Sequence, residues 1–168
     1  SLGANPIETI ARATGLWTLR FMVITLAVTP LRWATGWNAV IRVRRMLGLF
    51  AFFYGTLHLL TYLWLDQFFD WSAIAKDVVK RPFITAGFSA YALLVPLAIT
   101  STAAMIRRLG GPAWRRLHRL AYVAAALGVV HYWWLVKLDT RPPRNYGILL
   151  ALLLLARLAM LVRRRRSD

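Results

Sequence analysis

Two histidines, His58 and His131, lie inside separate apolar stretches of this 168-residue chain. Ionisable side chains are costly in the hydrocarbon of a membrane, and those that occur there usually serve a function. Imidazole is also a common axial ligand of haem iron. The chemistry that these residue types allow is therefore metal ligation, provided that the two side chains reach one iron.

The elements that carry the histidines are predicted to be membrane helices. Hydrophobic residues make up 59% of the chain, whereas soluble domains contain about 45–50%. They form long stretches, and a helix needs roughly 20 apolar residues, or about 17 at the least, to cross a membrane. The sequence predicts an all-α, polytopic membrane helix bundle without an internal repeat. Its five transmembrane helices are expected at about residues 16–32, 46–66, 83–106, 114–137 and 146–162.

The positive charges orient these helices. Thirteen Lys and Arg residues lie in residues 32–45, 107–119 and 163–166, against seven in residues 1–15, 67–82 and 137–144. Basic residues accumulate on the cytoplasmic side of a membrane, so we place the C-terminus in the cytoplasm and the N-terminus outside. An outer N-terminus requires a removed signal peptide or an earlier helix. We favour an earlier helix, which gives six in the full-length protein.

The connection between the second and third helices, residues 67–82, contains a further pattern. Positions 71, 74, 75, 78 and 79 are apolar and share one face of a helix. A short amphipathic helix on the outer, periplasmic surface explains this spacing. The alternative is a plain loop.

Helix geometry predicts that the two histidines lie at the same depth. Both of their helices run from inside to outside, and His58 follows Arg45 by 13 residues whereas His131 follows Arg116 by 15. At 1.5 Å per residue, each lies on the order of 20 Å from the inner boundary. The imidazoles are therefore expected to be level, in the outer half of the membrane.

Two glycines favour a flat cofactor between these histidines. Gly55 and Gly128 each stand three positions before a histidine, on its own helix. Small residues beside a ligand leave room for a macrocycle, although close helix packing in membranes also selects them. Combined with level histidines, the pattern predicts one haem held by His58 and His131.

The third histidine, His118, does not share that site on a regular helix. It precedes His131 by 13 residues, which places the two side chains roughly 140° apart around the helix. The residues 13 and 14 positions before His58 are Arg45 and Arg44, so a second haem has no evident ligand pair. We expect His118 to be an interfacial structural or cofactor-contacting residue. The alternative is a ligand of a second haem.

Two arginines lie within predicted helices. Arg20 is near the outer surface, where it would pair with a haem propionate, and Arg157 is near the inner surface, where it would contact an anionic cofactor. The alternative for both is a side chain that extends along its helix to the nearer surface.

Composition excludes several other classes of protein. The absence of cysteine rules out disulfides, thiolate ligation of haem and cysteine-ligated iron–sulfur clusters. Any redox chemistry must therefore lie on a bound cofactor. The net charge of +16 does not indicate nucleic-acid binding, because it follows the ends of the apolar stretches.

Several stretches together resemble one family. They are residues 3–8 (GANPIE), 25–32 (TLAVTPLR), 44–49 (RRMLGL), 57–62 (LHLLTY), 81–85 (RPFIT), 97–101 (LAITS), 114–120 (WRRLHRL) and 131–137 (HYWWLVK). On these stretches, which span essentially the whole chain, it is similar to the MsrQ (YedZ) family. That family comprises haem-binding membrane subunits of bacterial methionine sulfoxide reductase systems, in the ferric-reductase-like transmembrane superfamily. The resemblance implies a single domain of this type over residues 1–168.

The resemblance also implies cofactors. It assigns haem b to the chain, with His58 and His131 as iron ligands, and it extends to His118 as a ligand of a second haem or a cofactor contact. It adds a bound FMN without placing its site. Further cofactor contacts are expected at Gly55, Gly128, Arg20 and Arg157.

The implied function is electron transfer in the bacterial inner membrane. Electrons would come from the quinone pool or a cytosolic flavin reductase and pass to MsrP, a periplasmic molybdenum enzyme that repairs oxidised proteins. The chain would then be a redox subunit without catalytic residues of its own, with substrate catalysis on the partner. One alternative is a self-contained ferric or quinone oxidoreductase of the same superfamily. Another is a non-redox membrane scaffold with hydrogen-bonded core histidines.

Overall fold

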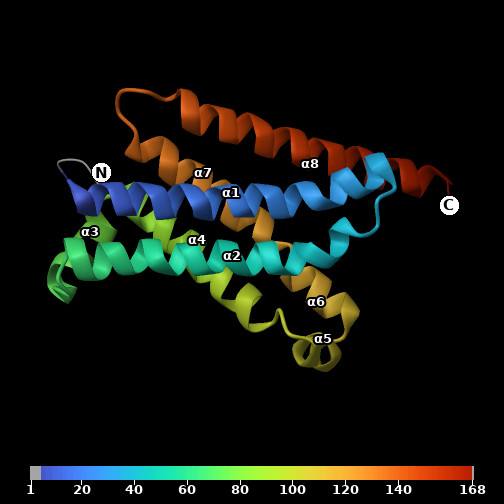
Figure 1. The fold of residues 1–168 in the computed structure, drawn as a ribbon, viewed down its shortest axis with the longest axis horizontal. Coiled ribbons are helices and arrows are strands. Elements are labelled where there is room, and N and C mark those ends of the chain that lie inside the picture. The colour runs from blue at the N-terminus through green and yellow to red at the C-terminus, as the bar shows by residue number, and fades with distance from the viewer. Residues whose placement is uncertain (1–4, 168) are drawn as a thin grey trace.

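The computed structural model of the chain describes residues 5–167, with side chains as far as Arg163. The described chain is helical and contains no strand, so the all-α prediction is confirmed (Figure 1). The elements are α1 (Pro6–Thr35), α2 (Val40–Leu60), the π-helix η1 (Thr61–Asp66), α3 (Trp71–Lys80), α4 (Pro82–Ile99), α5 (Ala103–Leu109), α6 (Gly111–Leu117), α7 (Leu120–Leu135) and α8 (Arg141–Ser167).

Within residues 5–167, four helices are long and apolar enough to cross a membrane. They are Pro6–Thr35, Val40–Asp66, Pro82–Ile99 and Arg141–Arg163. The chain is therefore a multi-pass membrane protein. The fifth predicted helix corresponds to α7, which has 16 residues and packs against α1, α4 and α8.

The bundle consists of two antiparallel helix pairs with α8 against one side. Helix α1 pairs with α2, and α4 pairs with α7, while α8 packs on α1 and α7 (Figure 1). Small residues allow the close approach at the centre, where Ala51 is 2% exposed and Ala124 and Ala125 are fully buried. By contrast, four leucines of α8 are more than half exposed and form an apolar surface suited to contact with lipid, namely Leu152, Leu155, Leu158 and Leu161.

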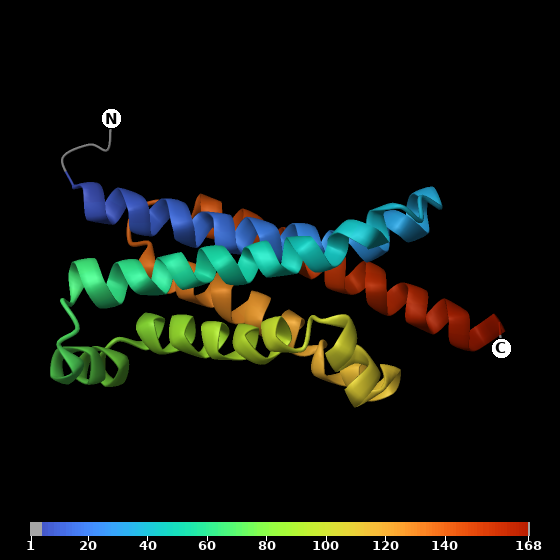
Figure 2. The ribbon, with the colours of Figure 1, turned by 60° about the horizontal axis from the view of Figure 1, so that its bottom comes forward.

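The prediction of one helix over residues 83–106 is wrong, because the chain breaks after Ile99. The Thr100 and Ser101 hydroxyls donate to the carbonyls of Pro96 and Leu97, each at 2.6 Å. The Thr102 hydroxyl then accepts from the N–H of Met105 and starts α5. Side chains of this kind offer the backbone an alternative to the helix ladder. Figure 2 shows the chain turning away at the end of α4.

The helix predicted over residues 114–137 is also divided, into α6 and α7, with the break at His118 and Arg119. The ring of His118 stacks on Trp114, with centroids 3.9 Å apart, and its Nε2 lies 3.0 Å from the Thr100 hydroxyl. Trp114 donates from its indole N–H to the Thr100 carbonyl at 2.9 Å. These bonds tie the break in the fourth predicted helix to the break in the third.

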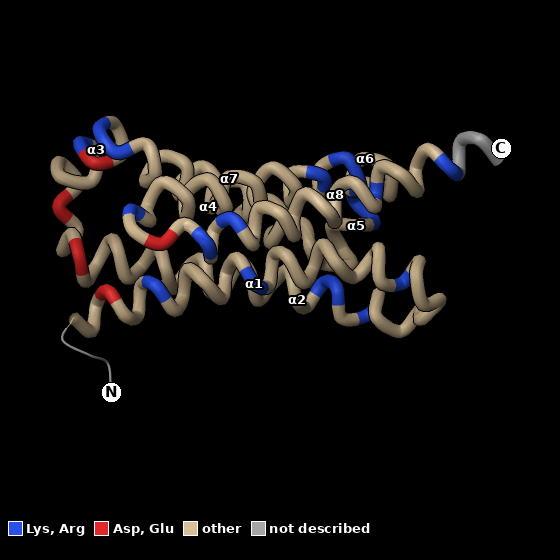
Figure 3. Tube along the Cα trace, turned by 90° about the horizontal axis from the view of Figure 1, so that it is seen from above, with Lys and Arg blue, Asp and Glu red and all other residues tan. Residues whose placement is uncertain are grey.

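The predicted amphipathic helix is confirmed as α3. The Asp70 carboxylate caps its start by accepting from the N–H groups of Ser72 and Ala73, each at 3.0 Å. All the described acidic residues gather at the end of the bundle that carries α3 (Figure 3). The sequence predicts this end to be the outer one on a separate ground, because fewer Lys and Arg residues lie there than at the opposite end.

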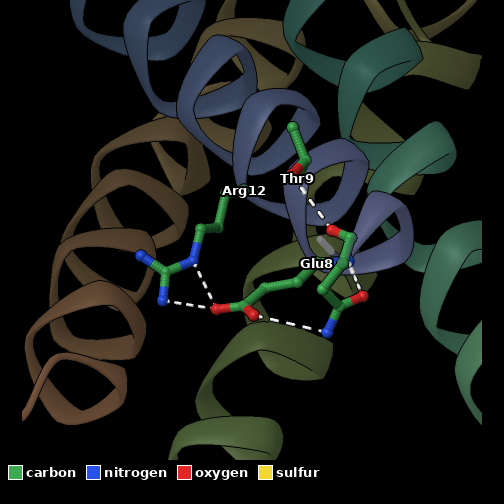
Figure 4. Close-up of polar contacts among 4 residues, drawn as sticks. Glu8, Thr9 and Arg12 are labelled. Carbon is green, nitrogen blue, oxygen red and sulfur yellow. Dashed lines mark hydrogen bonds and ion pairs between the residues drawn. The ribbon is translucent and has the colours of Figure 1, made fainter. Parts of the chain in front are cut away.

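The first helix begins at Pro6, ten residues before the predicted start. The Asn5 side chain accepts from the Glu8 N–H at 3.2 Å, and the Thr9 hydroxyl donates to the Asn5 carbonyl at 3.0 Å (Figure 4). Glu8 also pairs with Arg12 at 2.6 Å. Asparagine before a helix, with proline first and glutamate third, is a capping signal that the hydropathy pattern concealed. The extension brings the backbone of Ala11 into the helix.

Candidate functional site

His58 and His131 lie side by side between the two helix pairs. His58 comes from α2 and His131 from α7, and their ring centroids are 5.9 Å apart with the ring planes at 76°. Both side chains are partly buried. The structure thus confirms that the two histidines lie at the same level of the bundle, next to each other.

A backbone carbonyl of a neighbouring helix holds each imidazole. His58 Nδ1 lies 2.9 Å from the Ala11 carbonyl of α1, and His131 Nδ1 lies 2.6 Å from the Phe83 carbonyl of α4. A carbonyl only accepts hydrogen bonds, so Nδ1 carries the proton in both rings and Nε2 keeps a lone pair. No group among residues 5–167 hydrogen-bonds either Nε2. This is the arrangement that proteins use to orient metal-ligating histidines.

Two glycines lie against the imidazole rings, one on each helix that supplies a carbonyl. A Cβ atom added at Gly15 would lie 3.1 Å from His58 Cε1, and one added at Gly87 would lie 2.8 Å from His131 Nδ1. Sequence reasoning missed both residues. A glycine inside an apolar helix was their only signal, and it does not reveal which side chain approaches.

The glycines that the sequence did single out lie elsewhere. A Cβ atom at Gly55 would meet Thr18 Cγ2 at 3.5 Å, and one at Gly128 would meet Leu19 Cδ1 at 3.6 Å. Both therefore lie in contact with α1, at ordinary packing distances. A cofactor-binding role for Gly55 and Gly128 stays a prediction.

The two helix pairs repeat the same construction, although no internal repeat was expected. In each pair, an alanine and a glycine precede the histidine by seven and three positions on its helix. These residues are Ala51, Gly55 and His58 in α2, and Ala124, Gly128 and His131 in α7. The paired helix supplies the carbonyl and a glycine four positions later, so each pair presents its imidazole to the other in the same way.

His118 is not part of this cluster. It caps α6, and its Nε2 is hydrogen-bonded to Thr100 as described above. Since the helix breaks at this residue, the angular argument from a continuous helix does not apply to it. His118 therefore connects the end of α6 to the end of α4. Ligation of a second haem by His118 stays a prediction.

The two intramembrane arginines lie in different surroundings. Arg20 Nε donates to the Tyr146 hydroxyl at 3.3 Å, and its guanidinium lies over the Trp17 ring. Arg157 is only 9% exposed and donates to the Leu26 carbonyl at 2.6 Å and to the Tyr122 hydroxyl. It does not extend to the surface, so that alternative is wrong for Arg157.

The paired imidazoles fit a single metal centre that brings its own equatorial ligands. Metal–imidazole bonds are about 2 Å long, so two rings on opposite sides of one ion have centroids about 6 Å apart. The observed separation of 5.9 Å agrees with this value. Among residues 5–167, no group of three or more His, Asp or Glu side chains gathers to hold a bare ion. A porphyrin, which supplies four nitrogens to its iron, needs only two axial ligands from the protein.

Comparisons with known proteins identify the family of the chain. Residues 14–129 match the family described as "Ferric reductase like transmembrane component". Three relatives carry the name "Protein-methionine-sulfoxide reductase heme-binding subunit MsrQ". They come from Herminiimonas arsenicoxydans (62% identical over 93% of this chain), Azospira oryzae (59% over 92%) and Rhodospirillum rubrum (58% over 99%).

The chain spans 72%, 66% and 80% of the lengths of these three relatives, respectively. No solved structure matches it. With identities of this size over nearly the whole chain, and with a matching family domain over most of it, the chain belongs to the MsrQ family of ferric-reductase-like transmembrane proteins.

Proposed function

We propose that the chain binds one haem b between His58 and His131 and relays electrons across a bacterial inner membrane. The observation that carries the proposal is the pair of imidazoles 5.9 Å apart, each with Nδ1 on a carbonyl and Nε2 without a partner among residues 5–167. The relatives, which are named as heme-binding subunits, support the same cofactor.

The haem would supply a one-electron carrier, and the protein's own residues would set its environment. His58 and His131 would hold the iron, while the Ala11 and Phe83 carbonyls fix the orientation of each ring. Hydrogen bonds to the far nitrogen of a ligating imidazole raise its basicity. The surrounding apolar helices would limit access of water to the site.

The position of the site favours delivery to the outer side. Ala11 and Phe83 lie near the beginnings of α1 and α4, at the end of the bundle that carries α3. In our proposal, electrons enter from the quinone pool or a cytosolic flavin reductase and leave to the periplasmic methionine sulfoxide reductase subunit MsrP. The outer docking surface would comprise α3 and the connection from α7 to α8, and the C-terminus would be cytoplasmic.

FMN is the second cofactor in this proposal, and it rests on the family resemblance alone. Arg157, near the predicted inner surface, was expected to contact an anionic cofactor. Arg20 was expected to pair with a haem propionate. Both arginines already have protein partners. Acid extraction of purified protein followed by flavin fluorescence tests for bound FMN directly, whichever residues hold it.

A self-contained ferric or quinone oxidoreductase is the second candidate. The match to the ferric-reductase-like family favours it. It predicts turnover of ferric chelates or quinone by the purified subunit alone. The electron-relay proposal instead predicts that sustained methionine sulfoxide reduction requires the soluble partner.

The absorbance spectrum of purified full-length protein tests the haem proposal. A reduced-minus-oxidised b-type spectrum is expected in the wild type and in His118→Ala. It is expected to disappear in His58→Ala and in His131→Ala. A folded wild-type protein without haem, or full haem content in both variants, would contradict the proposal. A non-redox scaffold predicts the first of these results.

A further inference from the structure

We propose that Gly15 and Gly87 are positioning residues that set the orientation of the two haem-ligating imidazoles. Each forms a glycine notch, by which we mean a place on a helix where a missing side chain admits the ring of a histidine from the paired helix. The inference rests on the proposed haem site, and it concerns residues that lie outside the ligand set.

The two notches share one geometry. Gly15 follows Ala11 by four residues in α1, and Gly87 follows Phe83 by four in α4. In an α-helix, the carbonyl of residue i−4 pairs with the N–H of residue i. Each histidine therefore bonds to the carbonyl that the helix already directs towards the glycine. The ring reaches this carbonyl only by lying over the glycine itself.

The distances show how little space each notch leaves. At Gly15, an added Cβ would lie 3.1 Å from His58 Cε1 and 3.2 Å from His58 Nδ1. At Gly87, it would lie 2.8 Å from His131 Nδ1 and 3.0 Å from His131 Cε1. Real Cβ atoms essentially never show a contact under 3.0 Å, so alanine at position 87 forces a shift of the His131 ring or of the helix beside it. Alanine at position 15 requires a shift of only a few tenths of an ångström.

The two alanine substitutions are expected to change the haem environment to different extents. Since the substitution forces a shift at the His131 ring, beside its 2.6 Å bond to Phe83, Gly87→Ala should alter the haem environment strongly. Gly15→Ala should do so weakly. A role limited to helix packing predicts a different result, namely lower stability in Gly87→Ala with an unchanged resonance spectrum and potential of the haem that stays bound.

The chain provides matched controls for this distinction. Gly48→Ala and Gly147→Ala each add a methyl group inside a long helix, α2 and α8 respectively. Their Cβ atoms would meet Thr25 Cγ2 at 3.8 Å and Val129 Cγ1 at 3.5 Å, in ordinary contact and away from both rings. These variants change packing without changing the notches.

The test uses full-length protein purified in detergent. Size-exclusion chromatography selects the folded fraction of each variant, and only these fractions are compared. Three quantities are measured: haem per protein, the electron paramagnetic resonance spectrum of the oxidised haem, and the midpoint potential. Gly87→Ala is expected to lose at least half of the haem or to give a changed resonance spectrum and potential. Gly15→Ala should give a smaller change of the same kind, and both controls should match the wild type.

Wild-type values in Gly87→Ala, or equal changes in the controls, would overturn the inference. If Gly87→Ala does not fold, Gly15→Ala decides, and a wild-type resonance spectrum in that variant would overturn the inference. Failure of the haem proposal itself is distinguishable. It appears as haem retained in His58→Ala and His131→Ala, whatever the glycine variants do.

Discussion

The Nδ1 atom of His58 and the carbonyl oxygen of Ala11, 47 positions apart in the chain, lie 2.9 Å from each other. This contact fixes which nitrogen of the imidazole carries the proton. It also joins the beginning of α1 to the C-terminal part of α2, so the ring cannot turn without breaking this hydrogen bond. The contact between His131 and Phe83 does the same for α7 and α4.

Exchange of one ligand should change the redox potential without removing the haem. In His131→Met, the thioether replaces one imidazole, and a Met/His pair raises the potential of a haem. Axial ligand identity accounts for a span of about 0.8 V among haem proteins, so a rise should be evident in a potentiometric titration. His118→Met serves as the control and should leave the potential unchanged. A lowered or unchanged potential in His131→Met would contradict iron ligation by His131.

His118 is expected to contribute to stability rather than to haem content. Its Nε2 lies 3.0 Å from the Thr100 hydroxyl. Hydrogen bonds between helices in membranes contribute about 0.6 kcal/mol on average, and at most about 1.7 kcal/mol. His118→Ala and Thr100→Val should therefore each lower the thermal midpoint. Each variant also removes one further contact, the stacking on Trp114 or the bond to the Pro96 carbonyl. The iron-to-protein ratio should stay at the wild-type value in both, and a loss of half the iron in His118→Ala would make His118 a ligand.

The sequence was sufficient to predict that the two histidines meet. The rise per residue of a helix is fixed, so counting from Arg45 and Arg116 gave the depths of His58 and His131. The sequence was not sufficient to predict which residues hold the two imidazoles in place. The contact of Gly87 with His131 joins two helices, and which faces meet depends on packing of the whole bundle.

The breaks in the third and fourth predicted helices could not be predicted from hydropathy either. Residues 83–106 and 114–137 are apolar enough for continuous helices, and hydropathy does not register a hydroxyl that bonds back to its own helix. Thr100 does so, and it also bonds to His118, 18 positions later. Tertiary hydrogen bonds of this kind override local propensity. The early start of α1, by contrast, was legible in the capping residues Asn5, Pro6 and Glu8.

Arg157 is expected to hold three helices together. It lies on α8 and donates to the Leu26 carbonyl of α1 and to the Tyr122 hydroxyl of α7, while its Nε is buried without a partner among residues 5–167. Arg157→Leu would leave the Leu26 carbonyl unsatisfied, which typically costs about 1–3 kcal/mol. The thermal midpoint should fall clearly, whereas Tyr122→Phe, which removes only one acceptor, should cost less.

A double-mutant cycle tests the Arg157 assignment. Because Arg157 and Tyr122 contact each other, the double variant should be more stable than the sum of the single effects predicts. Independent effects would contradict a direct bond. Arg20→Leu is the comparison outside this cluster, since Arg20 bonds to Tyr146 instead.

Asp77 should hold α3 against η1. Its carboxylate accepts from the Tyr62 hydroxyl of η1 at 3.2 Å and pairs with Arg81 at 3.2 Å. Asp77→Asn removes the negative charge of the carboxylate and weakens both contacts. Hydrogen bonds to a charged group contribute about 1.5–3 kcal/mol each when they are shielded from water. The expected loss lies at the low end, because the Arg81 side chain is 54% exposed. Amide hydrogen exchange in residues 71–80 should become faster, while exchange in α4 and the haem spectrum should not change. Lys76→Gln, on the same helix, is the control, and equal acceleration in that variant would show that Asp77 does not hold α3.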